Sequence, residues 1–238
     1  MIDILPKDTK EVFTYKPFLT LQGEGINTGL PTTLIRFGKC NLRCNFCDAY
    51  FNWNANFEMT IEELLPYIKK NILFTGGEPL FNNFRQQYIY SVIKHFEQEK
   101  GLKGIYEIET NGSNYINDYL IEVLTSINIS PKEDRYQLKD YKVSYKLLEQ
   151  LDEFKDKYIV KFVFDNTEEN KKFIFDVIEK FNVDINKVFI MPKGKTIDEI
   201  KQVFEDALEF ALTNNFRFTP RLHIMLFKPN YSKWNTFD

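Results

Sequence analysis

The residues of this chain best suited to chemistry are its three cysteines, Cys40, Cys44 and Cys47. Thiolates that lie this close together in sequence are typical of a metal site rather than of a disulfide framework. Each of them can bind one iron of a [4Fe–4S] cluster, and three ligands leave the fourth iron open. An open iron can act on a bound small molecule, so the spacing predicts a cluster that takes part in chemistry.

Other interpretations of the cysteines are weaker. A structural zinc site normally has four Cys or His ligands, and the chain adds only His95 and His223, both distant in sequence. A disulfide framework fails because the number of cysteines is odd, and an electron-transfer ferredoxin would need a fourth nearby cysteine. Ordinary buried cysteines would not be expected to fall together in one loop.

Length and composition are those of a soluble globular protein. The chain has 238 residues, of which 43% are apolar and 27% are charged, and this size fits one domain over residues 1–238. The net charge of −3 gives no reason to expect a nucleic-acid or membrane partner. We also find neither a run of about 20 apolar residues nor a signal peptide at the start. A cytoplasmic location is therefore expected.

Strand-like and helix-like segments alternate along the chain. We expect strands over residues 32–37, 72–75, 104–109, 127–129, 158–164 and 187–191, and helices over 60–70, 85–99, 116–125, 168–181 and 196–213. Capping-box patterns begin the first and last of these helices, at Thr60 and Thr196. The alternation predicts a parallel α/β sheet, with the active site in loops that follow the strands.

Several of these loops carry residues suited to binding a ligand. Two glycines in the segment 75–79 can bring the backbone close to an amino-acid moiety, although a lone Gly-Gly is usually a turn. Gln22 and Glu24 offer the donor and acceptor groups that a pterin or guanine-like ring requires, or they belong to an exposed loop. Arg36 is the one charge in an apolar strand, so it either binds a substrate carboxylate or points to solvent.

Three further residues have both a structural and a functional interpretation. Phe46 could shield a cluster or flank an adenine ring, or it could pack the loop. Asp48 could accept hydrogen bonds near a substrate or help to hold a cation, or it could cap a turn. His223 could donate to a substrate, although a histidine on an apolar segment is more often structural.

These motifs resemble one branch of the radical S-adenosylmethionine (SAM) superfamily, the 7-carboxy-7-deazaguanine synthases, over nearly the whole chain. Cys-x3-Cys-x2-Cys by itself is typical of the superfamily. The branch is indicated by Leu-Gln-Gly-Glu-Gly, Arg before the cluster, Cys-Asp, Thr-Gly-Gly-Glu-Pro, Glu-Thr-Asn-Gly, Ser-Pro-Lys and Pro-Arg-Leu-His. The resemblance implies an incomplete (β/α) barrel, a [4Fe–4S] cluster on the three cysteines and a homodimer.

The resemblance also assigns two groups of binding residues. SAM would contact Phe46, Asp48, Gly77, Glu109, Asn111, Ser130, Pro131, Lys132, Met191, Pro192, Lys193 and Gly194. The substrate would contact Leu21, Gln22, Gly23, Glu24, Arg36, Thr75, His223 and Pro229.

The implied reaction is a ring contraction in queuosine and 7-deazapurine biosynthesis. One electron from the cluster cleaves SAM, and the resulting 5′-deoxyadenosyl radical takes a hydrogen from C6 of 6-carboxy-5,6,7,8-tetrahydropterin. The ring then contracts, ammonia leaves and 7-carboxy-7-deazaguanine forms. A flavodoxin- or ferredoxin-type protein would supply the electron.

The chain departs from the family pattern in three places. The family usually has Thr or Ser after Cys-Asp to contact a Mg²⁺, whereas this chain has Ala49 beside Asp48. Either the ion binds through water, Asp48 and substrate, or this chain has no need of it. The extension 230–238 follows the last motif, and the charged segment 133–145 matches the family poorly.

Two other classes of function stay open. Another radical SAM enzyme, such as a glycyl-radical activase, shares the cysteine spacing but lacks the Leu-Gln-Gly-Glu-Gly segment and the Arg36 clamp, and it acts on a protein. A non-catalytic iron–sulfur or zinc module predicts a fully ligated metal that leaves SAM intact.

Overall fold

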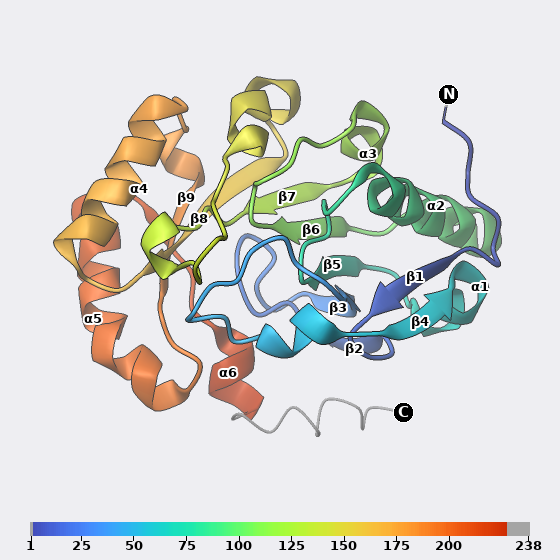
Figure 1. Cartoon of the computed structure of the whole chain (residues 1–238), viewed down its shortest axis with the longest axis horizontal. Coiled ribbons are helices and arrows are strands. Elements are labelled where there is room, and N and C mark those ends of the chain that lie inside the picture. The colour runs from blue at the N-terminus through green and yellow to red at the C-terminus, as the bar shows by residue number, and fades with distance from the viewer. Residues whose placement is uncertain (1, 228–238) are drawn as a thin grey trace.

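A single sheet connects most of the chain (Figure 1). The computed structural model describes residues 2–227, and within that range ten strands pair in the order β10-β9-β8-β7-β6-β5-β3-β1-β4, with β2 paired to β3. Their bounds are β1 Lys10–Phe13, β2 Phe18–Leu21, β3 Pro31–Phe37, β4 Phe57–Thr60, β5 Ile72–Gly76, β6 Tyr106–Thr110, β7 Ser126–Ile129, β8 Tyr158–Phe164, β9 Val188–Pro192 and β10 Arg217–Phe218.

The strands from β3 to β10 in this order are parallel, while β1, β2 and β4 are antiparallel additions at one end. Since β4 and β10 are the two ends of the order and are not paired with each other, the barrel is incomplete. The parallel strands bring their carboxyl ends to the same edge, where the connecting loops meet.

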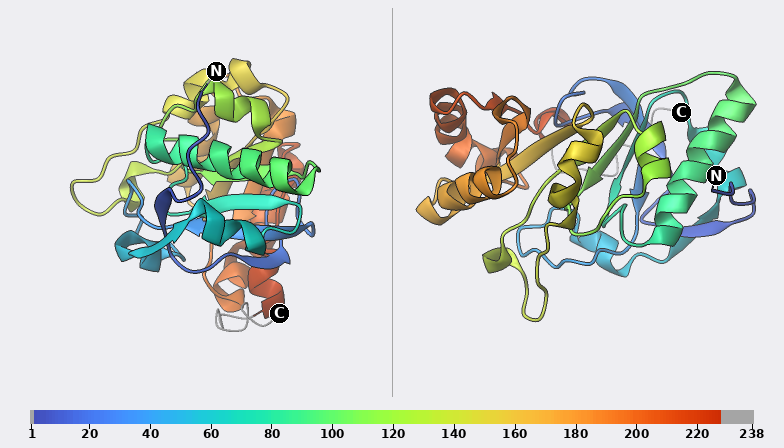
Figure 2. Two further views of the ribbon diagram at one scale, coloured as in Figure 1. Left: turned by 90° about the vertical axis from the view of Figure 1, so that its right-hand side faces the viewer. Right: turned by 90° about the horizontal axis from the view of Figure 1, so that it is seen from above.

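Helices cover the outside of this sheet, with α2 and α3 at one end and α4 and α5 at the other (Figures 1 and 2). The α-helices are α1 Ile61–Leu64, α2 Asn83–Lys100, α3 Asp118–Val123, α4 Glu168–Lys180, α5 Ile197–Thr213 and α6 Leu222–Phe227. Short 3-10 helices span Tyr50–Asn54, Leu65–Tyr67, Asp134–Tyr136, Lys146–Phe154 and Ile185–Lys187. None of the helices in the described range is long and apolar enough to cross a membrane.

The sequence predicted the buried parallel strands and the long helices well. The expected strand 158–164 coincides with β8, and α5 begins after Thr196, whose side chain accepts a hydrogen bond from the Glu199 N–H at 3.2 Å. These elements follow from apolar periodicity and capping residues that act locally.

The helix expected over residues 60–70 was wrong in its length. The capping box at Thr60 and Glu63 is present, but α1 ends at Leu64 and a 3-10 turn follows. Pro66 explains the end, because proline has no N–H to donate to the helix and its ring clashes with the preceding turn. The helix expected over 116–125 is likewise shorter, from Asp118 to Val123.

A buried ion pair joins the antiparallel part of the sheet to α2. Arg85 is 2% exposed and binds both carboxylate oxygens of Glu11, at 3.1 and 3.0 Å. Its Nη1 also donates to the carbonyls of Gly38 and Glu78, and its guanidinium lies 4.9 Å from the centre of the Phe37 ring. Arg85 therefore fixes β1, the end of β3 and the loop after β5 around one charge.

Replacing this arginine tests that role. In Arg85→Met, Glu11 keeps a buried charge with no counterion, and we expect the free energy of unfolding to fall by about 3–5 kcal/mol. The double variant Glu11→Leu/Arg85→Met removes both charges and should recover much of the loss. Chemical denaturation measures both. A single variant as stable as the wild-type protein would contradict this account of the pair.

Candidate active site

One cavity of about 520 Å³ opens at the carboxyl edge of the parallel strands. Its walls include residues from successive strands, among them Arg36 of β3, Thr75 of β5, Glu109 of β6 and Lys161 of β8. This volume is within the usual range for small-ligand sites. The cysteine loop lies directly after β3, so all three cysteines also line the cavity.

The cysteines are unpaired thiols in a partly buried setting. Burial raises the pKa of Cys40 to about 12 and that of Cys47 to about 11, with Glu78 and Asp48 adding to the respective effects. Thiols with such values bind a proton firmly at neutral pH unless a cationic group replaces it. This chemistry suits thiolates that exist only when bound to metal.

The donor set fits a cluster better than a single ion. Within residues 2–227, no three His, Cys, Asp or Glu side chains are grouped closely enough to hold one metal ion. In a [4Fe–4S] cluster each cysteine binds a different iron, so the ligands surround a group larger than one ion. Three cysteines on one cavity wall fit that arrangement.

The two glycines at the end of β5, Gly76 within the strand and Gly77 after it, have a structural role as well as a possible role in ligand binding. A Cβ on Gly77 would lie 1.7 Å from the Lys39 carbonyl oxygen, and Gly76 has a φ of +124°. The Gly77 N–H donates to the Phe37 carbonyl at 2.9 Å. The glycines thus allow the end of β5 to lie against the start of the cysteine loop.

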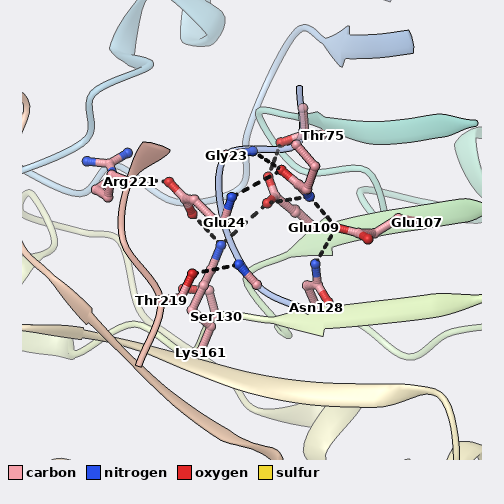
Figure 3. Close-up of polar contacts among 12 residues, drawn as sticks. Gly23, Glu24, Thr75, Glu107, Glu109, Asn128, Ser130, Lys161, Thr219 and Arg221 are labelled. Carbon is pink, nitrogen blue, oxygen red and sulfur yellow. Dashed lines mark hydrogen bonds and ion pairs between the residues drawn. The ribbon is translucent and has the colours of Figure 1, made fainter. Parts of the chain in front are cut away.

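A network of buried charges crosses the cavity (Figure 3). Glu24 contacts the ammonium of Lys161 and accepts a hydrogen bond from Arg221 Nε at 3.0 Å. Burial opposes ionisation of Glu24, but the charges of Lys161 and Arg221 outweigh it and hold its pKa well below the ordinary value. Lys161 also lies 3.4 Å from Glu109, which accepts a hydrogen bond from the Thr75 hydroxyl.

Arg221 connects three parts of the cavity. Besides Glu24, its guanidinium contacts the carboxylate of Asp48 and the carbonyl of Gly194. Burial raises the pKa of Asp48, but the Arg221 charge more than offsets it and the net shift is downward. Next to it, Gly23 approaches His223 so closely that a Cβ there would lie 2.1 Å from Nδ1.

Asp48 and Ala49 do not fit a Mg²⁺ ion. Ala49 is buried and offers no side-chain oxygen, and the Asp48 carboxylate is already in contact with the Arg221 guanidinium. A divalent cation here would have at most the other oxygen of Asp48 as a side-chain ligand from this pair, and it would lie close to the positive charge of that guanidinium.

Glu107 holds side-chain amides of the loop after β2. This residue is 3% exposed and contacts the side-chain amides of Gln22, Asn27 and Asn128. Gln22 Oε1 accepts the Gly23 N–H at 2.8 Å, so both ends of its amide are bound within the protein. Gln22 therefore fixes the loop, rather than pointing both of its polar groups at a ligand.

The structure brings together nearly all the residues that the sequence had singled out. The cavity wall contains Leu21, Gln22, Gly23, Glu24, Arg36, Cys40, Cys44, Phe46, Cys47, Asp48, Ala49, Thr75, Gly77, Glu109, Asn111, Ser130, Lys132, Met191, Lys193, Gly194 and His223. Pro131 and Pro192 do not line it. Pro229 and the extension 230–238 lie outside the described residues.

Lys161, Arg221 and Glu107 were not among the predicted site residues. Lys161 is a charge within an apolar strand, which is the same signal that had identified Arg36. Arg221 lies in the Pro-Arg-Leu-His motif, yet only its neighbour His223 was chosen. Glu107 alternates with apolar residues on β6 and resembles an outward-facing strand residue in sequence.

Comparison with known proteins indicates which family shares these features. The chain is 29% identical to the 7-carboxy-7-deazaguanine synthase of Pyrobaculum aerophilum over 224 residues, covering 91% of this chain and 95% of that protein. It is also 29% identical to the enzyme of that name from Clostridium acetobutylicum, covering 90% and 95%. The chain resembles 7-carboxy-7-deazaguanine synthase along nine-tenths of its length. No family model matches it.

Solved structures share the fold. QueE from Escherichia coli superposes with a TM-score of 0.66 at 19% identity, covering 90% of this chain and 95% of that one. An anSMEcpe structure with bound AdoMet and a peptide gives a TM-score of 0.51 at 17% identity, covering 80% and 63%. The incomplete β/α barrel expected from the sequence is confirmed.

Glu107 gives a pH-dependent prediction. Burial raises its pKa to about 7, so between the unfolded value near 4.5 and pH 7 the folded protein binds this proton more firmly than the unfolded chain. Stability from this group is therefore gained as pH falls through that window. The shift corresponds to roughly 3 kcal/mol.

We expect the wild-type protein to gain stability relative to Glu107→Gln by this order of magnitude between pH 8 and pH 5. Denaturant unfolding at several pH values measures the difference, with the exposed Glu205→Gln on α5 as the control. Parallel stability profiles for wild type and Glu107→Gln would contradict the assignment.

Proposed function

We propose that this chain is a radical SAM lyase that converts 6-carboxy-5,6,7,8-tetrahydropterin into 7-carboxy-7-deazaguanine with loss of ammonia. The observation that supports this most strongly is one cavity lined by three cysteines and by Arg36. The similarity to 7-carboxy-7-deazaguanine synthases over nine-tenths of the chain agrees with it. The whole chain would form one catalytic domain.

The cysteines would hold the [4Fe–4S] cluster, and SAM would lie beside it. When bound, the cluster would supply the electron that cleaves SAM to the 5′-deoxyadenosyl radical. The residues proposed for SAM are those named from the resemblance, and Phe46, Gly77, Asn111, Ser130 and Lys193 among them line the cavity. Phe46 is fixed for this role by an edge-on contact with Tyr136, with ring centres 5.0 Å apart.

The pterin carboxylate would bind Arg36. Among the described residues, the Arg36 side chain has one hydrogen-bond partner. Its Nε donates to the Tyr15 hydroxyl at 2.7 Å. That bond fixes the plane of the guanidinium and leaves its terminal nitrogens for a ligand in the cavity. A planar pair of N–H donors matches a carboxylate in both shape and charge.

The charged network would shape the rest of the substrate site. Glu24 and Lys161 are buried and paired, so they present a fixed pattern of charge to the ring. Burial lowers the pKa of His223, which favours the neutral imidazole at neutral pH. A neutral histidine can donate or accept one hydrogen bond at the ring edge.

We further propose that the reaction does not depend on Mg²⁺. In this arrangement Arg221 supplies positive charge next to Asp48, where the family pattern has a metal ion beside a hydroxyl residue. The electron would come from a flavodoxin- or ferredoxin-type donor, and the enzyme would act as a homodimer in the cytoplasm.

An anaerobic assay of the reconstituted protein tests the proposed function. It contains SAM, dithionite and 6-carboxytetrahydropterin, with Mg²⁺ or with EDTA, and mass spectrometry reads the products. We expect 7-carboxy-7-deazaguanine in both conditions at comparable rates. SAM cleavage without conversion of the pterin would favour another radical SAM activity, such as a glycyl-radical activase. Intact SAM with a fully loaded metal would favour a non-catalytic module, and loss of turnover in EDTA would contradict the metal independence.

Arg36 gives a prediction specific to the pterin. Arg36→Gln keeps a polar side chain but loses the charge, and removal of one partner of a buried charged pair costs about 2–5 kcal/mol. We therefore expect kcat/KM for the pterin to fall by roughly 30-fold or more. SAM cleavage by dithionite without pterin should persist, since Arg36 does not touch the cysteines. Equal losses in both reactions would show that Arg36 supports the fold rather than the substrate.

A further inference from the structure

The segment 133–145, which matches the family pattern poorly, lies directly against the cysteine loop. Figure 2 shows it as a yellow-green loop that extends from the body of the domain. Its backbone pairs with the loop through two hydrogen bonds, Asn45 N–H to the Tyr136 carbonyl and Leu138 N–H to the Arg43 carbonyl, both at 2.9 Å. The segment therefore packs against the cysteine loop.

One side chain of this segment contacts a cysteine sulfur. Gln137 Nε2 lies 3.1 Å from Cys44 Sγ. The orientation of the amide is fixed independently, because Gln137 Oε1 accepts the Arg43 N–H at 3.1 Å. A backbone N–H can only donate, so the oxygen must face Arg43 and the NH₂ group must face the sulfur.

The surroundings hold this contact in place. Cys44 is 8% exposed and forms an isolated bridge with Gln137 in the antiparallel sense. Arg43 is stacked over Tyr141 at 5.0 Å from its ring centre, which adds a second tie between the loop and the segment. The N–H donor therefore lies in a partly buried and ordered setting, where a hydrogen bond to a charged sulfur is stronger than in water.

We propose that Gln137 tunes the reduction potential of the cluster through its hydrogen bond to Cys44. The inference rests on the cluster assignment made under the proposed function. One-electron reduction increases the negative charge on the cluster and its sulfur ligands, and an N–H dipole aimed at a sulfur stabilises the reduced state more than the oxidised one. Gln137 thus makes the cluster easier to reduce by its electron donor.

Asn111 makes a similar but weaker approach on the other side. Its Nδ2 lies 3.9 Å from Cys40 Sγ, while its Oδ1 accepts the Ser113 N–H at 2.9 Å. Because its donor bonds Asn41 Oδ1 at 2.9 Å, Asn111 contributes less to the sulfur. We therefore expect substitution of Gln137 to change the reduction potential more than substitution of Asn111.

The test is a redox titration of the reconstituted protein followed by electron paramagnetic resonance of the reduced cluster. Gln137→Leu removes the donor, and Gln137→Glu retains the acceptor for Arg43 but places an oxygen where the donor was. Both midpoint potentials should become more negative. A tenfold fall in the equilibrium constant for reduction, the order expected for a hydrogen bond to a charged group, equals about 59 mV for a one-electron couple.

Leu138→Ala is the matched control, because it alters the exposed side chain next in the segment and keeps the backbone bond to Arg43. Its midpoint should equal that of the wild type. Unchanged midpoints in both Gln137 variants, at wild-type iron content and SAM affinity, would overturn the tuning role while leaving the proposed function intact. A wild-type protein that assembles no cluster would contradict both the tuning role and the proposed function.

Discussion

The pairing of Glu24 with Lys161 and Arg221 is the constraint on which the cavity depends. A buried carboxylate is stable only when it is paired with an opposite charge, and the same holds for a buried cation. The three groups come from the loop after β2, from β8 and from the segment before α6. Because the two cations meet on the carboxylate of Glu24, the pairing holds distant parts of the chain around one space.

The charge network also separates the cavity into two chemical regions. Arg221 reaches from Glu24 to Asp48, which directly follows the last cysteine. The cysteine side carries three sulfur atoms, one of which accepts a hydrogen bond from the Gln137 amide, whereas the strand side carries the fixed charges of Glu24, Lys161 and Glu109. An iron–sulfur cluster requires sulfur ligands, whereas a polar heterocycle requires charged and hydrogen-bonding groups. One cavity that offers both can hold their reacting atoms close together.

The sequence predicted the parts of this protein that are set by local rules. The buried strand β8 is a β-branched and aromatic run interrupted only by Lys161, and Thr196 caps the start of α5. The three cysteines fall at a diagnostic spacing. In contrast, β1, β2 and β4 are short strands with weak patterns at the antiparallel end of the sheet, so their pairing depends on contacts that the local sequence does not record.

Two of the missed site residues share a physical cause. Lys161 and Glu107 lie on strands, and which face of a strand is inside depends on the register of the whole sheet. Gln137 comes from a segment without a family pattern, and only the folded chain places it at Cys44. Sequence spacing therefore identified the cysteines but could not identify the groups that surround their sulfur atoms.

The central claim is that SAM and a carboxylated pterin react within this one cavity. Deuterium at C6 of 6-carboxytetrahydropterin provides the most direct measurement. A single anaerobic turnover should transfer that label into 5′-deoxyadenosine, which mass spectrometry would detect as a gain of one mass unit. Product formed with no label in any of the 5′-deoxyadenosine would contradict the account, because the radical would then have taken its hydrogen from another position.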